Sequence, residues 1–262
     1  NRHSISKAAL ENIMNMYRQQ RYDECIKEVK SKLKQSPNSL HLLNYQAMAY
    51  SALKKDREAL MSYQKIIKKD PSLAGPYYNM GVILKRTGRV KEAMDSYKRA
   101  ISLKNDYVQA YNNLGVLYKD NEKYENAIKM FTKAKEIQPD HQNSYFNLAL
   151  IKKEQGLIEE ALKLLLKVLD INPEHNEARY NISLLKKGKG LITEAKEYLE
   201  QILISDKKHE NAFKELVTLL AEIGDFKEAI DRIRNCGQAN SKNTTLLAVF
   251  GLCLLTSCLL YT

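Results

Sequence analysis

Three histidines recur at intervals of 34 residues, at His141, His175 and His209, and imidazole is the side chain that most often binds metal ions. If the interval reflects a repeated helical unit, equivalent residues lie two helix widths apart, roughly 8–10 Å each. Ligands of one ion must each lie about 2 Å from it. We therefore expect these histidines to lie in loops between repeats, and we expect neither a metal ion nor another cofactor.

Two polar series share the interval of 34 residues. The Asn series is Asn79, Asn113, Asn147 and Asn181, and the Lys series is Lys85, Lys119, Lys153 and Lys187. An asparagine amide both donates and accepts hydrogen bonds, so it can pair with a peptide backbone of any sequence. Lysines favour acidic side chains. These eight residues predict a surface that binds an extended, acidic peptide.

An apolar series lies between the two polar ones and would accept hydrophobic anchors of such a peptide: Met48, Val82, Val116, Leu150 and Leu184. Each polar series also has a simpler interpretation. The asparagines would then hydrogen-bond a neighbouring helix, and the lysines would be solvated surface residues.

Catalytic motifs are absent from the sequence. It has no glycine-rich phosphate loop, no HExxH, no nucleophile elbow and no paired cysteines with zinc-site spacing. We therefore predict that these 262 residues are not an enzyme.

The elements that position these residues follow from further series with the same interval. Small residues recur at Cys25, Ala59, Ala93, Ala127, Ala161, Ala195 and Ala229, and again at Ala47, Gly81, Gly115, Ala149 and Ser183. Bulky residues recur at Tyr63, Tyr97, Phe131, Leu165, Leu199 and Ile233. Glycines at Gly88, Gly156, Gly190 and Gly224 suit the end of a helix, and prolines at Pro37, Pro71, Pro139 and Pro173 mark where a second helix must stop.

Within one interval the apolar spacing is helical. Tyr77, Met80 and Leu84 form one face, and Ala93 and Tyr97 begin the next, as the i, i+3, i+4, i+7 pattern requires. Each unit is therefore a helix, a turn and a second helix. A single hairpin cannot bury its own apolar face, so we expect the hairpins to stack.

The segments Tyr77–Gly81 and Lys91–Ala100, together with Gly88, resemble a tetratricopeptide repeat, as does the segment from Tyr111 to Pro139. The resemblance implies an all-α fold, an α-solenoid of antiparallel hairpins forming a right-handed superhelix whose concave wall is lined by the first helices. The expected repeats are 6–39, 40–73, 74–107, 108–141, 142–175, 176–209 and 210–243. Terminal repeats diverge, as expected where one face meets water.

The resemblance also bears on function. Similar asparagine ladders occur in the repeat region of the O-linked N-acetylglucosamine transferases, which implies an alternative role as the substrate-recognition region of a larger enzyme, with catalytic residues beyond Thr262. Chaperone-binding members of the family hold a terminal carboxylate with paired Lys and Asn residues on their first helices. No unit of this chain supplies that pair, so a co-chaperone is disfavoured.

The formal net charge of +11 favours acidic partners. Many lysines lie beside Glu or Asp, as in Lys91-Glu92, so nucleic-acid binding is disfavoured. The four cysteines, Cys25, Cys236, Cys253 and Cys258, form no disulfide framework, and Cys25 occupies a small-residue position that suits a buried thiol. We therefore predict a protein-interaction scaffold in the reducing cytoplasm, of unknown oligomeric state.

Residues 243–262 carry no charged side chain, and this length is near the threshold for a membrane span. Gly251 continues the small-residue series in phase, which favours a partial eighth repeat or a cap over residues 244–262. The alternative is a membrane anchor, which would make the chain a tail-anchored receptor.

Overall fold

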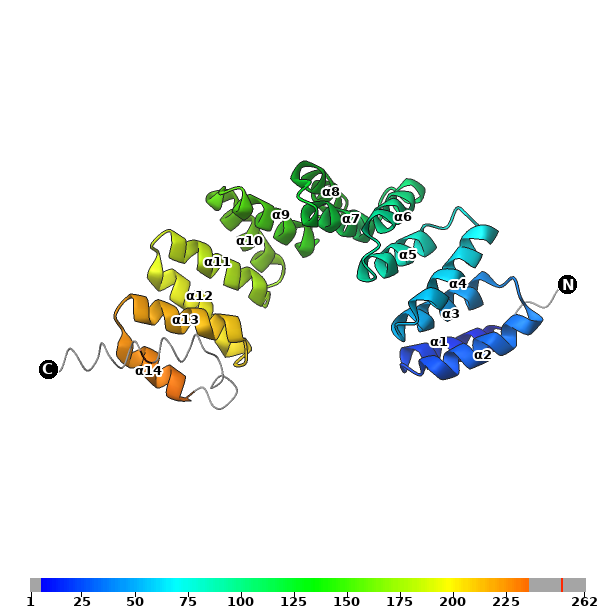
Figure 1. The fold of residues 1–262 in the computed structure, drawn as a ribbon, viewed down its shortest axis with the longest axis horizontal. Helices are drawn as coiled ribbons and strands as arrows, with labels where there is room; N and C mark the ends of the chain where they lie inside the picture. The colour runs from blue at the N-terminus through cyan, green and yellow to red at the C-terminus, as the bar shows by residue number, and fades with distance from the viewer. Residues whose placement is uncertain (1–5, 236–250, 252–262) are drawn as a thin grey trace. The chain divides into compact units, whose positions relative to one another are not determined.

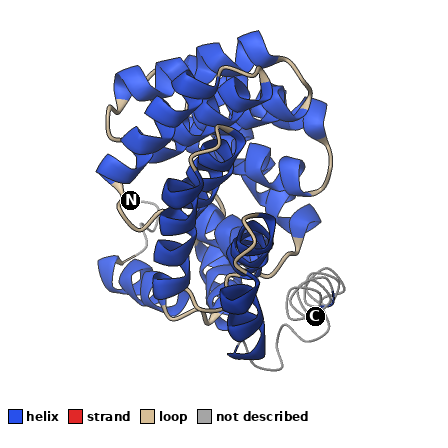
Figure 2. Ribbon diagram, turned by 90° about the vertical axis from the view of Figure 1, so that its left-hand side faces the viewer, coloured by secondary structure: helices blue, strands red, loops and turns tan. Residues whose placement is uncertain are grey.

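The computed structural model describes residues 6–235 and 251, and all regular structure in those residues is α-helical (Figures 1 and 2). The predicted all-α class is thus confirmed. The helices are α1 (Lys7–Arg18), α2 (Tyr22–Gln35), α3 (Leu40–Ala52), α4 (Asp56–Lys69), α5 (Ala74–Arg86), α6 (Val90–Leu103), α7 (Val108–Asp120), α8 (Tyr124–Ile137), α9 (Gln142–Glu154), α10 (Ile158–Ile171), α11 (Asn176–Gly188), α12 (Ile192–Ser205), α13 (Glu210–Glu222) and α14 (Phe226–Asn235).

Within each helix pair, the turn has a middle residue in the left-handed region of backbone space. The predicted glycines hold this position at Gly88, Gly156, Gly190 and Gly224, with φ between 74° and 80°. The same position is held without glycine by Gln20, Lys54 and Glu122, with φ between 58° and 60°. Every pair therefore turns in the same way, but three of the turns place a side chain where glycine is favoured.

The prolines lie where the sequence places them, two residues beyond the end of a second helix. Pro37 follows the last residue of α2, Gln35, and Pro173 follows the last residue of α10, Ile171. Proline restricts the residue before it to extended conformations, so the helix cannot continue through this point.

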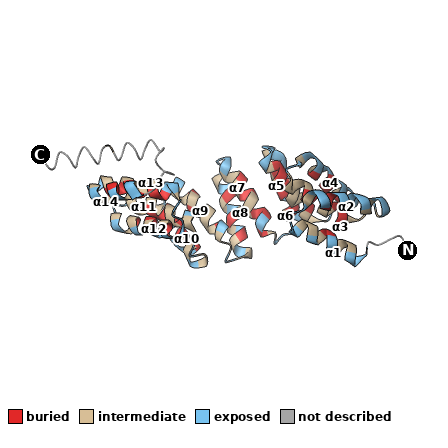
Figure 3. Ribbon diagram, turned by 90° about the horizontal axis from the view of Figure 1, so that it is seen from below, coloured by how far each residue is buried: buried red, intermediate tan, exposed pale blue. Residues whose placement is uncertain are grey.

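The chain divides into two compact units, residues 1–139 with α1 to α8 and residues 140–262 with α9 to α14. In each unit a helix packs against its hairpin partner and against the next pair. Buried residues recur along each helix between exposed ones (Figure 3). This is the pattern expected where each hairpin buries its apolar face only against its neighbours.

The core of each unit is built from the small and bulky series. In unit 1, Tyr63, Tyr97 and Phe131 are at most 2% exposed. In unit 2, Leu165 and Leu199 take their place, each 1% exposed. Cys25 is a buried free thiol, as predicted, and burial raises its pKa.

The predicted C-terminal segment 244–262 lies outside the described residues except for Gly251, as do Cys236, Cys253 and Cys258. Among the described residues, none of the helices combines the length and the apolar character that crossing a membrane requires.

Candidate peptide-binding surface

The Asn and Lys series lie on the first helices of four consecutive pairs, α5, α7, α9 and α11. On α5, Asn79, Val82 and Lys85 follow one another at intervals of three residues, so they share one face of the helix. Seven of the eight series residues are partly exposed, whereas Asn181 is buried at 7% exposure. The series therefore lie at the surface of each unit, but their surroundings differ between the units.

In unit 1 the asparagines contact tyrosines of the preceding hairpin. Burial raises the pKa of the Tyr63 hydroxyl, and the nearby Asn79 side chain lowers it in part. The Asn113 amide donates to the Tyr78 hydroxyl at 3.2 Å. This bond holds the Asn113 amide at a fixed orientation beside the half-buried face of α7.

The buried Tyr97 hydroxyl lies near the Asn113 side chain, which favours its ionised form, whereas burial raises its pKa more strongly. That hydroxyl makes no hydrogen bond of ordinary geometry in the described part of the chain. Asn113 therefore hydrogen-bonds the Tyr78 hydroxyl, and the Tyr97 hydroxyl is left without a well-formed hydrogen bond.

The lysines of unit 1 differ in their partners. Lys119 forms an ion pair with its neighbour Asp120, with the Nζ and Oδ1 atoms 3.2 Å apart. Within residues 6–235, no ion pair or hydrogen bond involves the ammonium group of Lys85. Of these two lysines, Lys85 is therefore the one without an acidic partner in that part of the chain.

In unit 2 the two series contact each other. The Lys153 ammonium group donates to Asn181 Oδ1 at 2.8 Å, and the Asn181 amide donates to the Glu177 carbonyl at 2.9 Å. The Asn147 amide donates to the Asn143 carbonyl at 2.9 Å. The simpler interpretation, in which the asparagine bonds a neighbouring helix, describes the contact of Asn181 with Lys153 on α9, whereas the bonds to Glu177 and Asn143 lie within one helix.

Lys187 is neutralised within the chain. Its Nζ atom lies 2.8 Å from Glu215 and 3.0 Å from Glu222, both on α13. Glu215 stands 34 residues after Asn181, so it holds the next position of the Asn series. These bonds outweigh the effect of burial and raise the pKa of Lys187. The sequence contained this signal, because Glu215 continues the series with an acid.

The three histidines lie at the N-termini of α9, α11 and α13, immediately before the first helical residue. His175 Nδ1 accepts a hydrogen bond from the Ala178 backbone at 3.1 Å, and His209 Nδ1 accepts one from Ala212 at 3.1 Å. The rings of His175 and His209 thus satisfy backbone N–H groups that the helix leaves open, whereas the His141 side chain makes no such bond. Ser39, in the same series, caps α3 in this way and was a signal for this role.

No group of three or more metal-binding side chains occurs among the described residues. The rings of His175 and His209 pack on aromatic rings of the preceding first helix. The ring centroids of Phe146 and His175 lie 5.0 Å apart, and those of Tyr180 and His209 lie 6.0 Å apart.

Stacked antiparallel helix hairpins with a recurrent left-handed turn and a small-against-bulky core define a helical repeat protein. Models of the tetratricopeptide repeat match residues 45–72, 83–122, 106–174 and 177–214, which together cover more than half of the chain. The chain belongs to the tetratricopeptide repeat family. None of the curated proteins matches it.

Solved structures support the same fold. The chain is similar to MamA, with 25% identity and a TM-score of 0.58 over 65% of this chain and 97% of that one. It is similar to YrrB, described as a tetratricopeptide repeat protein with an unusual peptide-binding site, with 22% identity and a TM-score of 0.58 over 72% and 98%. The C-terminal part of a repeat protein from Cytophaga hutchinsonii matches with 17% identity and a TM-score of 0.72 over 92% and 98%.

Proposed function

We propose that this chain is a protein-interaction scaffold that binds an extended, acidic segment of a partner protein. The observation that carries the proposal is the face shared by α5 and α7, where Asn79 and Asn113 are partly exposed and the charge of Lys85 has no acidic partner among the described residues. YrrB, which has a similar fold, is described as having a peptide-binding site.

Each component of this face has a separate task. The Asn79 and Asn113 amides would pair with backbone groups of the bound segment, because one amide carries two donors and an acceptor that takes two bonds. Val82 and Val116, both partly exposed, would receive apolar side chains. Lys85 would attract a carboxylate, and this contribution would weaken as ionic strength rises.

The other series residues would contribute less. Lys187 is paired with Glu215 and Glu222, and Lys153 is bonded to Asn181. A bound peptide would have to displace these internal partners. We therefore propose α5 and α7 of unit 1 as the principal contact surface. Asn147, Lys153, Asn181 and Lys187 form a separate, secondary surface of unit 2.

The test begins by selecting peptides from a random library on the full chain and measuring the best binder by fluorescence anisotropy. The double variant N79A/N113A should bind it at least about tenfold more weakly, since each lost hydrogen bond contributes about 0.5–1.5 kcal/mol. The matched control is N126A, which removes an exposed asparagine of α8. Equal affinity of N79A/N113A and the parent chain would contradict the proposal.

The alternative, a recognition region of a larger O-linked N-acetylglucosamine transferase, would use the same face. It predicts that the selected peptides contain serine or threonine as well as acidic residues, because these hydroxyls are the acceptors of O-linked transfer. Acidic binders without serine or threonine would be consistent with the scaffold role and would argue against the alternative.

A further inference from the structure

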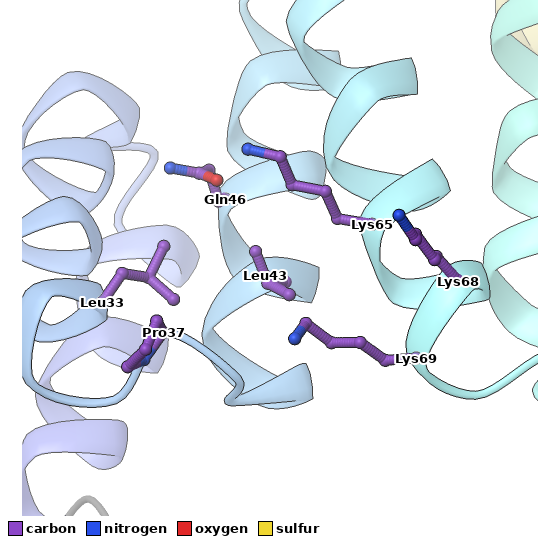
Figure 4. Close-up of a pocket in the computed structure, with 7 residues that line it drawn as sticks. All are labelled: Leu33, Pro37, Leu43, Gln46, Lys65, Lys68 and Lys69. Carbon is purple, nitrogen blue, oxygen red and sulfur yellow. The ribbon is translucent and has the colours of Figure 1, made fainter.

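A pocket of about 620 Å³ opens in unit 1 between the end of α2, helix α3 and helix α4. Its lining residues are Leu33, Pro37, Leu43, Gln46, Lys65, Lys68 and Lys69. Figure 4 shows Lys65 and Lys69 reaching from α4 toward α3, with Leu33 and Pro37 on the other side of Leu43. The pocket thus has an apolar floor and a basic rim, and it shares no residue with the Asn and Lys series.

The floor is open because two series change at this repeat. Leu43 stands where the next three repeats carry an aromatic ring, Tyr77, Tyr111 and Tyr145. Lys69 stands where they carry Leu103, Ile137 and Ile171. A smaller side chain replaces a ring, and a charged side chain replaces an apolar one. Space that the later repeats fill with hydrocarbon is therefore left beside Leu43.

The wall of the pocket also differs from the equivalent positions of the later repeats, because it carries a polar residue. Gln46 is only 7% exposed, yet the five repeats that follow carry Met80, Leu114, Leu148, Ile182 and Leu216 at this position. Its Oε1 atom accepts a hydrogen bond from Ser62 at 3.4 Å. Burying an amide is costly unless it is hydrogen-bonded, and here the amide supplies a polar group at the wall between the apolar floor and the basic rim.

The rim lacks the acids that neutralise equivalent lysines elsewhere. Lys133 pairs with Glu136 at 3.1 Å, and Lys167 pairs with Asp170 at 3.7 Å. In the repeat that forms the pocket, the acid of that pair is replaced by Lys68. No ion pair in the described part of the chain involves Lys65 or Lys68, and Lys69 bonds the neutral Asn38 side chain.

We propose that this pocket is a second binding site, which takes a protein segment with one aliphatic side chain followed by carboxylates. The aliphatic group fills the space beside Leu33, Pro37 and Leu43, which the later repeats close for themselves. The carboxylates lie against Lys65, Lys68 and Lys69, where two later repeats carry Glu136 and Asp170. The ligand therefore supplies, from outside, the apolar filling of the next three repeats and the negative charge that these two acids provide.

The experiment titrates a capped peptide, Gly-Leu-Asp-Glu-Asp-Gly, into the isotope-labelled full chain and follows backbone amide signals by NMR. We expect saturable shifts around Leu43 and Lys69. Two control peptides replace Leu by Ser, or the acids by Asn and Gln. Each should bind at least about fivefold more weakly, because the first loses a buried apolar side chain and the second loses the ionic contacts with the lysines. Higher ionic strength should weaken the parent peptide.

The decisive variant refills the pocket with residues that the later repeats use, L43Y/Q46L/K69I. It should bind the peptide at least about tenfold more weakly, because both the space and a rim charge are gone. The Ser62 hydroxyl stays satisfied, since it also donates to the Glu58 carbonyl at 2.9 Å. The surface variant K65Q/K68Q tests the rim without changing the core. Its control is K129Q/K163Q, which also removes two positive charges from exposed positions.

Saturable binding that is lost in L43Y/Q46L/K69I and K65Q/K68Q, and kept in K129Q/K163Q and N79A/N113A, would support the second site. Absence of saturable binding would overturn it. Binding that survives refilling but is lost in N79A/N113A would also overturn it, because the peptide would then occupy the α5–α7 face instead.

Discussion

Gly115 on α7 lies against the ring of Phe131 on α8, so closely that a Cβ atom added at residue 115 would meet Phe131 Cε1 at 2.7 Å. Phe131 is fully buried, so its ring has little room to move. Gly81 stands in the same relation to Tyr97, at 2.6 Å from its Cε1 atom. A missing side chain on the first helix therefore makes room for a ring on the second.

The variant Gly115→Ala should destabilise unit 1 by about 1–3 kcal/mol, the usual cost of forcing an extra group into a close-packed core. The measurement is the free energy of unfolding from urea denaturation followed by circular dichroism. Gly188 is the control, because it is also helical, as the last residue of α11, and has no atom within 4 Å of an added Cβ. Gly188→Ala should be neutral or stabilise by up to about 1 kcal/mol.

The same contact predicts a rescue. In unit 2, Ala149 and Leu165 hold the positions that Gly115 and Phe131 hold in unit 1, and both are buried. The double variant G115A/F131L should therefore be more stable than the sum of the two single changes predicts, by about 0.5–3 kcal/mol of interaction energy. Strict additivity in a double-mutant cycle would show that the ring does not limit the size of residue 115.

The left-handed turns give a prediction of opposite sign. Glu122 has φ of 58° and stands where four other repeats carry glycine. Glu122→Gly should stabilise the chain by up to about 1 kcal/mol, because the left-handed conformation costs a residue with a Cβ about 1–2 kcal/mol while glycine loses more entropy on folding. Thermal unfolding of the two proteins measures the difference.

Two substitutions serve as its controls. Replacing Gly156, which has φ of 74°, by alanine should lower the stability of the chain. Lys129→Gly, at an exposed position inside α8, should cost about 1 kcal/mol, the normal penalty for glycine in a helix. If Glu122→Gly were as destabilising as Lys129→Gly, the turn conformation would not be the cause.

Most of the fold could be predicted from the sequence because each hairpin solves the same packing problem with the same side chains. The interval of 34 residues fixed the helix pairs, and the glycines and prolines marked their ends. The turns at Gln20, Lys54 and Glu122 could be placed only by their spacing, since their residue types do not favour a positive φ. The capping role of His175 and His209 was missed because histidine is an uncommon N-cap.

The candidate surface was harder to predict because its hydrogen bonds are made between repeats. Asn79 meets a hydroxyl at Tyr63, 16 residues earlier, whereas the residue 16 positions before Asn181 is Leu165, which has none. Identical asparagines therefore have different partners. The ion pair of Lys187 with Glu215 likewise depends on an acid in the following repeat. A series predicts the position of a side chain but not its hydrogen-bond or ion-pair partner in the neighbouring repeat.

Two tyrosines of unit 1 should respond differently to loss of their hydroxyls. The Tyr78 hydroxyl accepts a hydrogen bond from the Asn113 amide at 3.2 Å, whereas the buried Tyr97 hydroxyl has no well-formed bond within the described residues. Tyr78→Phe should cost about 0.5–1.5 kcal/mol. Tyr97→Phe should be neutral or stabilising, because it removes a buried group without a partner, and Phe131 shows that the series accepts phenylalanine. Unfolding free energies that are lowered equally in both variants would contradict this difference.

His141 should make the stability of unit 2 depend on pH. Burial lowers its pKa below the ordinary value of 6.5, and Asp140 opposes this effect only in part. The folded chain therefore favours the neutral ring, whose Nδ1 lies 2.8 Å from the buried Ser144 hydroxyl. Well above pH 6.5 neither state binds this proton, so the contribution of His141 is complete. As the pH falls below 6.5, the unfolded chain binds the proton first, and stability is lost until the pH passes the folded pKa.

The variant His141→Asn tests this dependence, because its amide also forms hydrogen bonds and suits an N-cap but does not titrate. Urea denaturation of both proteins between neutral pH and about pH 5 covers the range in which the unfolded histidine gains its proton. The parent should lose more stability over this range than His141→Asn, since the remaining titrating groups are common to both. Parallel pH profiles would show that His141 binds its proton equally well in the folded and unfolded chain.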